Sequence, residues 1–163
     1  MSRVYHGSID EVVNPEIRQP NRSLDYGSGF YTTTTTYEQA KRWVERRMKD
    51  KGVAIGYVNI YELDEKLVKN MKSLFFEKPT EEWVNFVMRN RTERNFIHDY
   101  DIVYGPVADD SVYTQFTLYE GGIISLPTLI HELKTYKLVD QYLFHTEKSL
   151  LAIKFVESEI VEI

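Results

Sequence analysis

An α+β fold in one domain is predicted by three observations. The chain has 163 residues, 42% of them hydrophobic, which suffices for one sizeable core but not for two ordinary domains. Strand and helix patterns alternate irregularly, without the ~30-residue period of βαβ units, and this favours α+β over a doubly wound sheet. No repeat, linker or shift in composition divides the chain, so residues 1–163 are expected to form a single domain.

The first predicted elements are a strand that runs into a helix. Residues 32–36 are all threonine, a β-branched run typical of a strand end. Thr36 and Gln39 then have the pattern of a capping box. The helix predicted over residues 37–50 ends at Gly52. Its apolar stripe, which is expected to face the core, comprises Ala40, Trp43, Val44 and Met48.

The rest of the chain supplies further strands and helices. Residues 53–63 are rich in β-branched and aromatic side chains and predict a strand buried on most of both faces. A helix capped by Thr80 follows, and then a strand over residues 101–107. The remaining predicted elements are a helix from about residue 110 to Glu120, a short helix from Pro127, and strands at residues 142–145 and 153–163.

Composition and charge exclude several classes of protein. Without cysteine, the chain cannot form a disulfide framework, a thiolate nucleophile or a cysteine-based zinc site. No stretch approaches the roughly 20 apolar residues that cross a bilayer, and no leader pattern opens the chain, so we expect a cytoplasmic protein without membrane contact. The net charge of -5 argues against general attraction to nucleic acid. One local basic patch comprises Lys41, Arg42, Arg46, Arg47, Lys49 and Lys51.

Several familiar chemistries have no matching pattern. His98 and His131 stand alone without the spacing of metal ligands, so no metal site is predicted. The serines lack a nucleophile elbow, and no Gly-x-x-x-x-Gly-Lys loop is present to hold phosphates.

Three short motifs, far apart in the chain, carry the chemistry that the sequence does suggest. The first is Tyr-His-Gly at residues 5–7, where glycine lets backbone groups approach a ligand. The second is Gly-Ser-Gly-Phe-Tyr at residues 27–31, which precedes a strand and lacks the third glycine of a Rossmann fingerprint. The third is Asp-Gln-Tyr at residues 140–142, which opens a strand.

In order and chemistry these motifs resemble those of the ADP-ribosyltransferase superfamily, in the branch that includes diphtheria toxin and the poly(ADP-ribose) polymerases. Nearly the whole chain is similar to an uncharacterised bacterial family placed in that superfamily. The shared pattern adds Gln-Ala at residues 39–40, Tyr-Asp-Ile-Val at 100–103 and Gly-Pro-Val-Ala-Asp-Asp at 105–110. The resemblance implies a split mixed β-sheet core with flanking helices, and NAD+ as substrate. Relatives in toxin–antitoxin or phage-defence loci imply a toxin with an antitoxin partner.

The resemblance also implies roles for individual residues. His6 is expected to bond a ribose hydroxyl, and the backbone of Gly7 to meet the carboxamide. Tyr31, which Gly29 allows close to the ligand, is expected to stack on the nicotinamide ring. Gln141 falls where the family carries its catalytic Glu. A glutamine can bond the ribose 2′-hydroxyl, but it brings no charge to an oxocarbenium-like transition state and cannot act as a base.

Other parts of the expected site leave alternatives open. Asp109 and Asp110 either supply the missing carboxylate or simply cap the next helix. The second aromatic wall of the nicotinamide clamp falls near Arg42 and Trp43. A one-residue shift would let Trp43 serve, whereas its place on the apolar stripe predicts core packing. Arg22 is the expected pyrophosphate contact, because a guanidinium matches phosphate oxygens in pairs.

Two functions of different class follow. The first is an NAD+-dependent ADP-ribosyltransferase that modifies a protein or nucleic acid. The second is a non-catalytic module that binds NAD+ or ADP-ribose, because Gln141 stands where the catalytic Glu is expected. RNA 2′-phosphate transfer to NAD+ uses the same fold, but it needs a basic cluster that the sequence does not place in the cleft.

Overall fold

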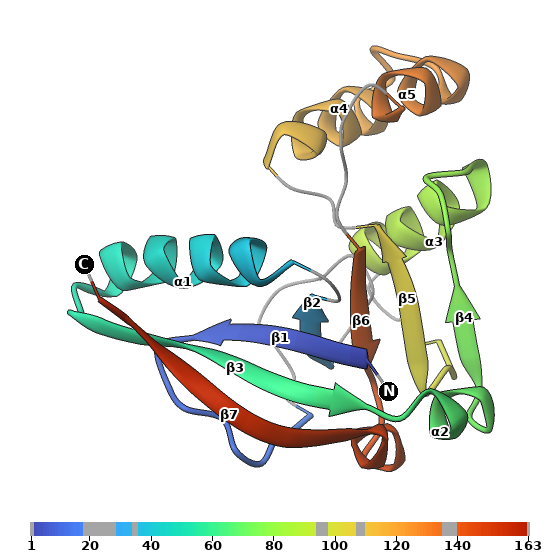
Figure 1. The fold of residues 1–163 in the computed structure, drawn as a ribbon. Coiled ribbons are helices and arrows are strands. Elements are labelled where there is room, and N and C mark those ends of the chain that lie inside the picture. Colours follow the sequence, from blue (N-terminus) through green and yellow to red (C-terminus); the bar gives the residue numbers. More distant parts are fainter. Residues whose placement is uncertain are drawn as a thin grey trace.

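The fold class is confirmed by the computed structural model, which describes residues 2–17, 29–33, 36–93, 98–106, 110–134 and 140–162 (Figure 1). Within these ranges the chain forms seven strands, five α-helices and one short 3-10 helix. Only the backbone is described for Tyr31, Thr33, Arg91 and residues 110–113. The fold is therefore α+β, as predicted.

The seven strands form one mixed sheet in the order β4-β5-β6-β2-β1-β3-β7. β4 and β5 are parallel, and the other neighbouring pairs are antiparallel. The strands are β1 (Ser2–Ser8), β2 (Phe30–Thr33), β3 (Ile55–Leu63), β4 (Ser73–Phe75), β5 (Ile102–Pro106), β6 (Asp140–Phe144) and β7 (Ile153–Glu162). The sequence analysis missed β4, which is only three residues long.

The sheet is split into two groups of strands that run across each other. β1, β3 and β7 lie in one direction, and β2, β6, β5 and β4 lie across it (Figure 1). β1 pairs with β3 along its whole length, but its described register with β2 is a single pair, Tyr5 with Thr33. The resemblance implied a split mixed sheet, and the two crossing groups of strands match that expectation.

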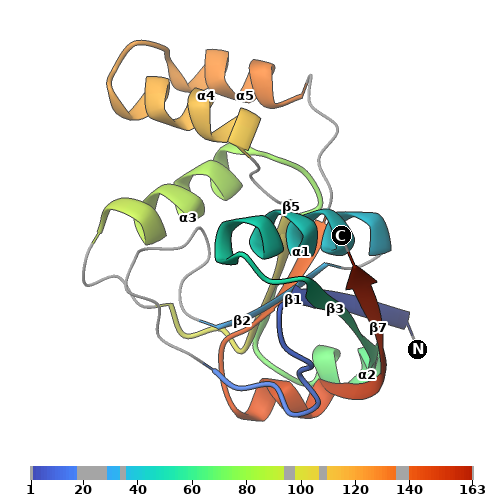
Figure 2. The same ribbon diagram turned by 90° about the vertical axis from the view of Figure 1, so that its left-hand side faces the viewer.

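Helices cover the two faces of the sheet unequally. The helices are α1 (Tyr37–Lys51), α2 (Glu65–Lys69), α3 (Glu81–Thr92), α4 (Asp110–Glu120), α5 (Leu126–Leu133) and the 3-10 helix η1 (Lys148–Ala152). Figure 2 shows α1, α3, α4 and α5 on one side of the sheet and α2 on the opposite side. We call these two sides the α1 face and the α2 face. None of the helices in the described ranges is long and apolar enough to cross a bilayer.

Three apolar clusters hold these layers together. Under α1, Ala40, Val44 and Met48 pack on Val58 and Ile60 of β3. The cluster under α3, α4 and α5 comprises Phe76, Trp83, Val84, Val87, Val103, Phe116, Leu129, Leu133 and Leu143. The cluster on the α2 face comprises Val4, Phe30, Tyr61, Leu63, Val68, Ile102, Phe144, Ala152 and Ile153. Each cluster joins strands to helices, which is how a sheet split in this way keeps one fold.

Local capping explains several helix boundaries. The Thr80 hydroxyl accepts a hydrogen bond from the backbone of Trp83, as predicted for a cap. Gly52 ends α1 with φ of 65°, a left-handed conformation that favours glycine. The capping box expected at Thr36 is wrong, since the side chain of this N-cap residue makes no capping hydrogen bond.

The predicted core position of Trp43 is also wrong. Its side chain is 49% exposed, whereas Ala40, Val44 and Met48 are buried. These three residues are spaced by four and define the centre of the buried stripe. Trp43 precedes Val44 by one residue, which turns it about 100° around the helix. It therefore lies at the edge of the stripe and faces solvent.

The two tryptophans give a matched test of this packing. Trp83 is fully buried, so Trp83→Ala should lower the free energy of unfolding by about 3–5 kcal/mol. Trp43→Ala removes a half-exposed ring and should cost about 1 kcal/mol or less. Urea denaturation followed by circular dichroism measures both values, and equal losses would contradict the placement of the two rings.

Candidate functional site

The three sequence motifs lie on three neighbouring strands. β1 carries His6 and Gly7, β2 carries Tyr31, and β6 carries Gln141. Tyr5 pairs with Thr33, and Thr33 pairs with Gln141, so one row of residues crosses all three strands. Segments from opposite ends of the chain are thereby brought within two strand spacings, about 10 Å.

The side chains of this neighbourhood do not all share one face. Directly paired residues point the same way and successive residues alternate. Gln141 and Gly7 therefore belong to the α1 face, in register with Tyr5. His6 belongs to the α2 face, where its ring lies 4.4 Å from the ring of Phe30.

Gly7 has a packing role that the sequence did not reveal. A Cβ atom at this position would lie 2.4 Å from the carbonyl oxygen of Ala40 and 2.6 Å from Cγ2 of Val44. α1 thus rests directly on the backbone of β1. Gly29 has a similar role, because a Cβ there would lie 2.5 Å from the carbonyl oxygen of Phe144. Both glycines allow close packing next to the split.

Gln141 is nearly enclosed by its neighbours. The side chain is 7% exposed, and its paired residues are Thr33 on β2 and Gly105 on β5. An uncharged amide is suited to such a place, because burial disfavours a charged group. A carboxylate at this position would have its pKa raised by the same burial.

A second polar row, which the sequence analysis missed, crosses the α2 face. Thr32 pairs with Tyr142, and Tyr142 pairs with Tyr104. The hydroxyl of Thr32 donates to the carbonyl oxygen of Tyr142 at 3.0 Å, and the two tyrosine rings lie 4.8 Å apart. By alternation His6 lies on this same face. The sequence signal for this row was the alternation of residues 140, 142 and 144, which places their side chains on one face of a strand.

Asp140 supplies a carboxylate to this second row. The Tyr104 hydroxyl donates to Oδ2 of Asp140 at 2.7 Å. Burial and, after it, this hydrogen bond raise the pKa of Tyr104 well above its usual value. Burial also raises the pKa of Tyr142. Both phenols therefore stay protonated at neutral pH and can donate hydrogen bonds.

The remaining predicted site residues are only partly described. Trp43 lies on the solvent side of α1, so its predicted core packing does not occur. Asp110 is the first residue of α4, a position at which an acid favours the positive helix end, but its side chain is not described. Asp109 and Arg22 lie outside the described residues. The described residues contain no cluster of His, Asp or Glu that could hold a metal ion.

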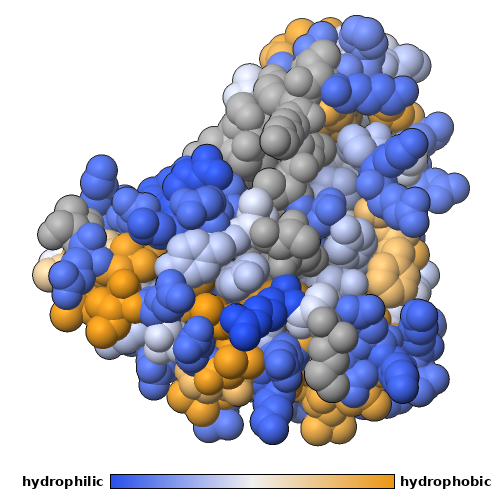
Figure 3. All heavy atoms as spheres, in the orientation of Figure 1, coloured by the Kyte–Doolittle hydropathy of each residue, from blue (hydrophilic) through white to orange (hydrophobic). Residues whose placement is uncertain are grey.

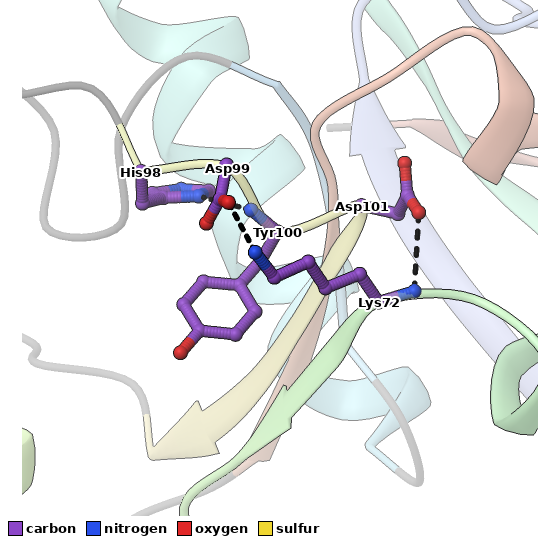
Figure 4. A network of polar contacts seen from close by, with 5 residues as sticks. All are labelled: Lys72, His98, Asp99, Tyr100 and Asp101. Atoms are coloured by element: carbon purple, nitrogen blue, oxygen red, sulfur yellow. Dashed lines mark hydrogen bonds and ion pairs between the residues drawn. The ribbon is translucent and has the colours of Figure 1, made fainter.

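A polar network at the other end of β5 is structural (Figure 4). Lys72 forms an ion pair with Asp99, which lowers the pKa of that carboxyl, and its ammonium lies 5.4 Å from the centre of the Tyr100 ring. Asp101 accepts from the Lys72 backbone at 3.1 Å and from the Thr146 hydroxyl at 2.7 Å. Asp101 thus joins the start of β4 to the end of β6, which explains the acid within the Tyr-Asp-Ile-Val motif.

Comparison with known proteins places this neighbourhood in a family. A protein-family model matches residues 2–155, which include all of β1, β2 and β6. The chain belongs to this family. It is described as a protein of unknown function (DUF3990). No curated protein and no solved structure matches the chain. For this DUF3990 chain, function therefore has to be argued from the site itself.

Gly7→Ala tests the close contact between α1 and β1. The added methyl group would overlap the backbone of Ala40, so the helix must shift and the free energy of unfolding should fall by about 1–3 kcal/mol. Gly121→Ala is the control, because its Cβ would meet nothing closer than 3.4 Å. Thermal unfolding followed by circular dichroism measures both. A Gly7→Ala protein as stable as the Gly121→Ala protein would contradict the packing.

Proposed function

We propose that this protein binds NAD+ where the two groups of strands meet, at β1 and β2, and transfers ADP-ribose to a macromolecule. One observation carries the proposal: the three motifs that resemble those of ADP-ribosyltransferases lie on adjacent strands, where the sheet splits. The order of the motifs along the chain did not require their strands to be neighbours. A site built from all three motifs does require it.

In this proposal the elongated ligand would contact both faces of the sheet. NAD+ has two halves joined by a pyrophosphate, and the two faces carry different groups. On the α1 face the nicotinamide half would meet Gln141 and the backbone of Gly7. On the α2 face the other half would meet the His6 ring beside Phe30. In this arrangement the ligand would contact both Gln141 and His6, although their side chains lie on opposite faces of the sheet.

The proposed reaction breaks the bond between the nicotinamide nitrogen and the ribose carbon. The electron pair of this bond leaves with nicotinamide, which becomes neutral, while positive charge develops on the ribose. A nucleophilic oxygen or nitrogen of the acceptor forms the new bond, and its proton passes to a base. Gln141 would orient the ribose 2′-hydroxyl through its amide. Catalysis depends on how well the site stabilises the developing charge.

The amide at Gln141 makes a slow enzyme or a binding module the second candidate. A carboxylate about 4 Å from the developing charge, at an effective dielectric constant near 20, is worth about 4 kcal/mol, or two to three decades in rate. The uncharged amide of Gln141 cannot provide this electrostatic stabilisation. A non-catalytic protein that holds NAD+ or ADP-ribose would keep the same pocket. The buried amide is the observation that favours it.

If the protein is an ADP-ribosyltransferase, we propose that it acts as a toxin. Modification of an essential macromolecule would harm the producing cell, so an antitoxin partner would be needed. This part of the proposal rests on the resemblance of the motifs. It is tested by growth of cells that express the protein.

His6→Ala tests the ligand assignment. Losing one hydrogen bond to ribose should weaken NAD+ binding about tenfold, and labelling of a lysate at sub-saturating radiolabelled NAD+ should fall by a similar factor. His131→Ala, at an exposed position on α5, is the matched control and should behave like the unmodified protein. Isothermal titration calorimetry measures binding, and gel autoradiography measures labelling. Full labelling by the His6→Ala protein would refute the assignment.

Gln141→Glu separates the two candidates. If the residue holds the place of the catalytic acid, a carboxylate there should raise nicotinamide release by up to two or three decades, reduced by the cost of burying its charge. Gln115→Glu, on α4, is the control. Chromatography of released nicotinamide gives the rates. An unchanged rate together with unchanged NAD+ affinity would show that Gln141 does not touch the ligand.

A further inference from the structure

We propose that the solvent side of α1 binds single-stranded nucleic acid. The surface consists of Arg42, Trp43, Arg46, Arg47 and Lys49, and we call it the α1 outer face. All five side chains are exposed. Neither the core nor the proposed NAD+ site uses them.

Positive charge in this acidic protein is concentrated on α1. The helix contains six of the twenty basic residues of the chain but only three of its twenty-five acidic residues. α1 therefore carries a charge of +3, while the rest of the chain carries -8. Hydrophilic side chains cover α1 where it faces the viewer (Figure 3). Such a local patch attracts a polyanion even when the net charge of the protein is negative.

The arrangement of the basic residues is regular. Arg42, Arg46 and Lys49 follow one another at intervals of four and three residues, so they form one stripe along the helix, with the exposed acids Glu45 and Asp50 beside it. Arg47 lies four residues after Trp43 on the adjacent stripe. Lys49 and Lys51 lie in the last turn, where cations favour the helix dipole. The dipole does not account for Arg42, Arg46 and Arg47, because all three lie before the last turn of the helix.

Trp43 distinguishes this surface from an ordinary solvated helix face. An indole that is 49% exposed, next to guanidinium groups, offers a flat platform on which a base can stack. The flanking arginines can pair with phosphate oxygens on either side of that base. In a duplex the faces of the bases are covered by their neighbours. The ring therefore favours a single strand.

Two other polyanions fit less well. A membrane-binding helix inserts an apolar face, but the apolar face of α1 is already buried against β1 and β3. An acidic protein segment would match the charge of the arginines, yet it offers Trp43 no flat partner. Charge and aromatic surface together select nucleic acid.

The α1 outer face lies on the side of the helix away from β1, which α1 contacts at Gly7. Transfer of ADP-ribose to a strand bound there would be a separate step. This last step rests on the proposed function, whereas binding to α1 does not.

Titration with oligothymidylate in the absence of NAD+ tests the binding. Trp83 is fully buried, so quenching of tryptophan emission should come from Trp43 and vanish in Trp43→Phe. With three to four phosphate contacts, the logarithm of affinity should fall with the logarithm of salt concentration at a slope of about -2 to -3. Arg42→Glu combined with Arg46→Glu should weaken binding at least tenfold in fluorescence anisotropy with a labelled oligonucleotide.

The controls decide between nucleic acid and its alternatives. Lys66→Glu combined with Lys69→Glu reverses two exposed charges on α2 and should leave the affinity unchanged. Polyglutamate and a DNA duplex should each bind more weakly than the single strand. The proposal is overturned by absent binding at low salt, by equal effects of the α1 and α2 variants, or by tighter binding of polyglutamate or duplex. If the unmodified protein binds the oligonucleotide but gives no NAD+-dependent labelling, the proposed function is rejected and the binding proposal stands.

Discussion

The pairing of the short strand β2 with its two neighbours is the interaction on which the rest of the structure depends. β2 pairs with β6 through all four of its residues, and Thr33 of β2 pairs with Tyr5 of β1. β2 thus joins the two groups of strands into one sheet. The two halves of the sheet can therefore run across each other and remain one fold. We place the ligand at this junction of the two groups of strands.

Packing on both faces holds the strands of this junction in place. On one side α1 is seated on Gly7, where any larger residue would collide with the helix backbone. On the other side Phe30 lies in the apolar cluster with Tyr61 and Phe144, and it contacts the His6 ring. Motif residues thus serve the fold as well as the proposed site. Substitutions at Gly7 have to be interpreted through stability as well as through ligand binding.

Residues 140 and 141 lie in different environments on the two faces of the sheet. Gln141 is buried on the α1 face, where charge is costly. Asp140, one residue earlier, lies on the α2 face with His6 and is hydrogen-bonded by Tyr104. The strand therefore presents an amide to one side of the sheet and a carboxylate to the other.

The sequence by itself determined the α+β class, the cap at Thr80, the glycine end of α1 and the three motifs, because these depend on local pattern and chemistry. Only the tertiary structure decided that β1, β2 and β6 are neighbours, that His6 and Gln141 lie on opposite faces, and that Trp43 faces solvent. Strand order and register are set by contacts between distant segments, which local periodicity does not encode. The direction of Trp43 was likewise set by where β1 and β3 touch the helix.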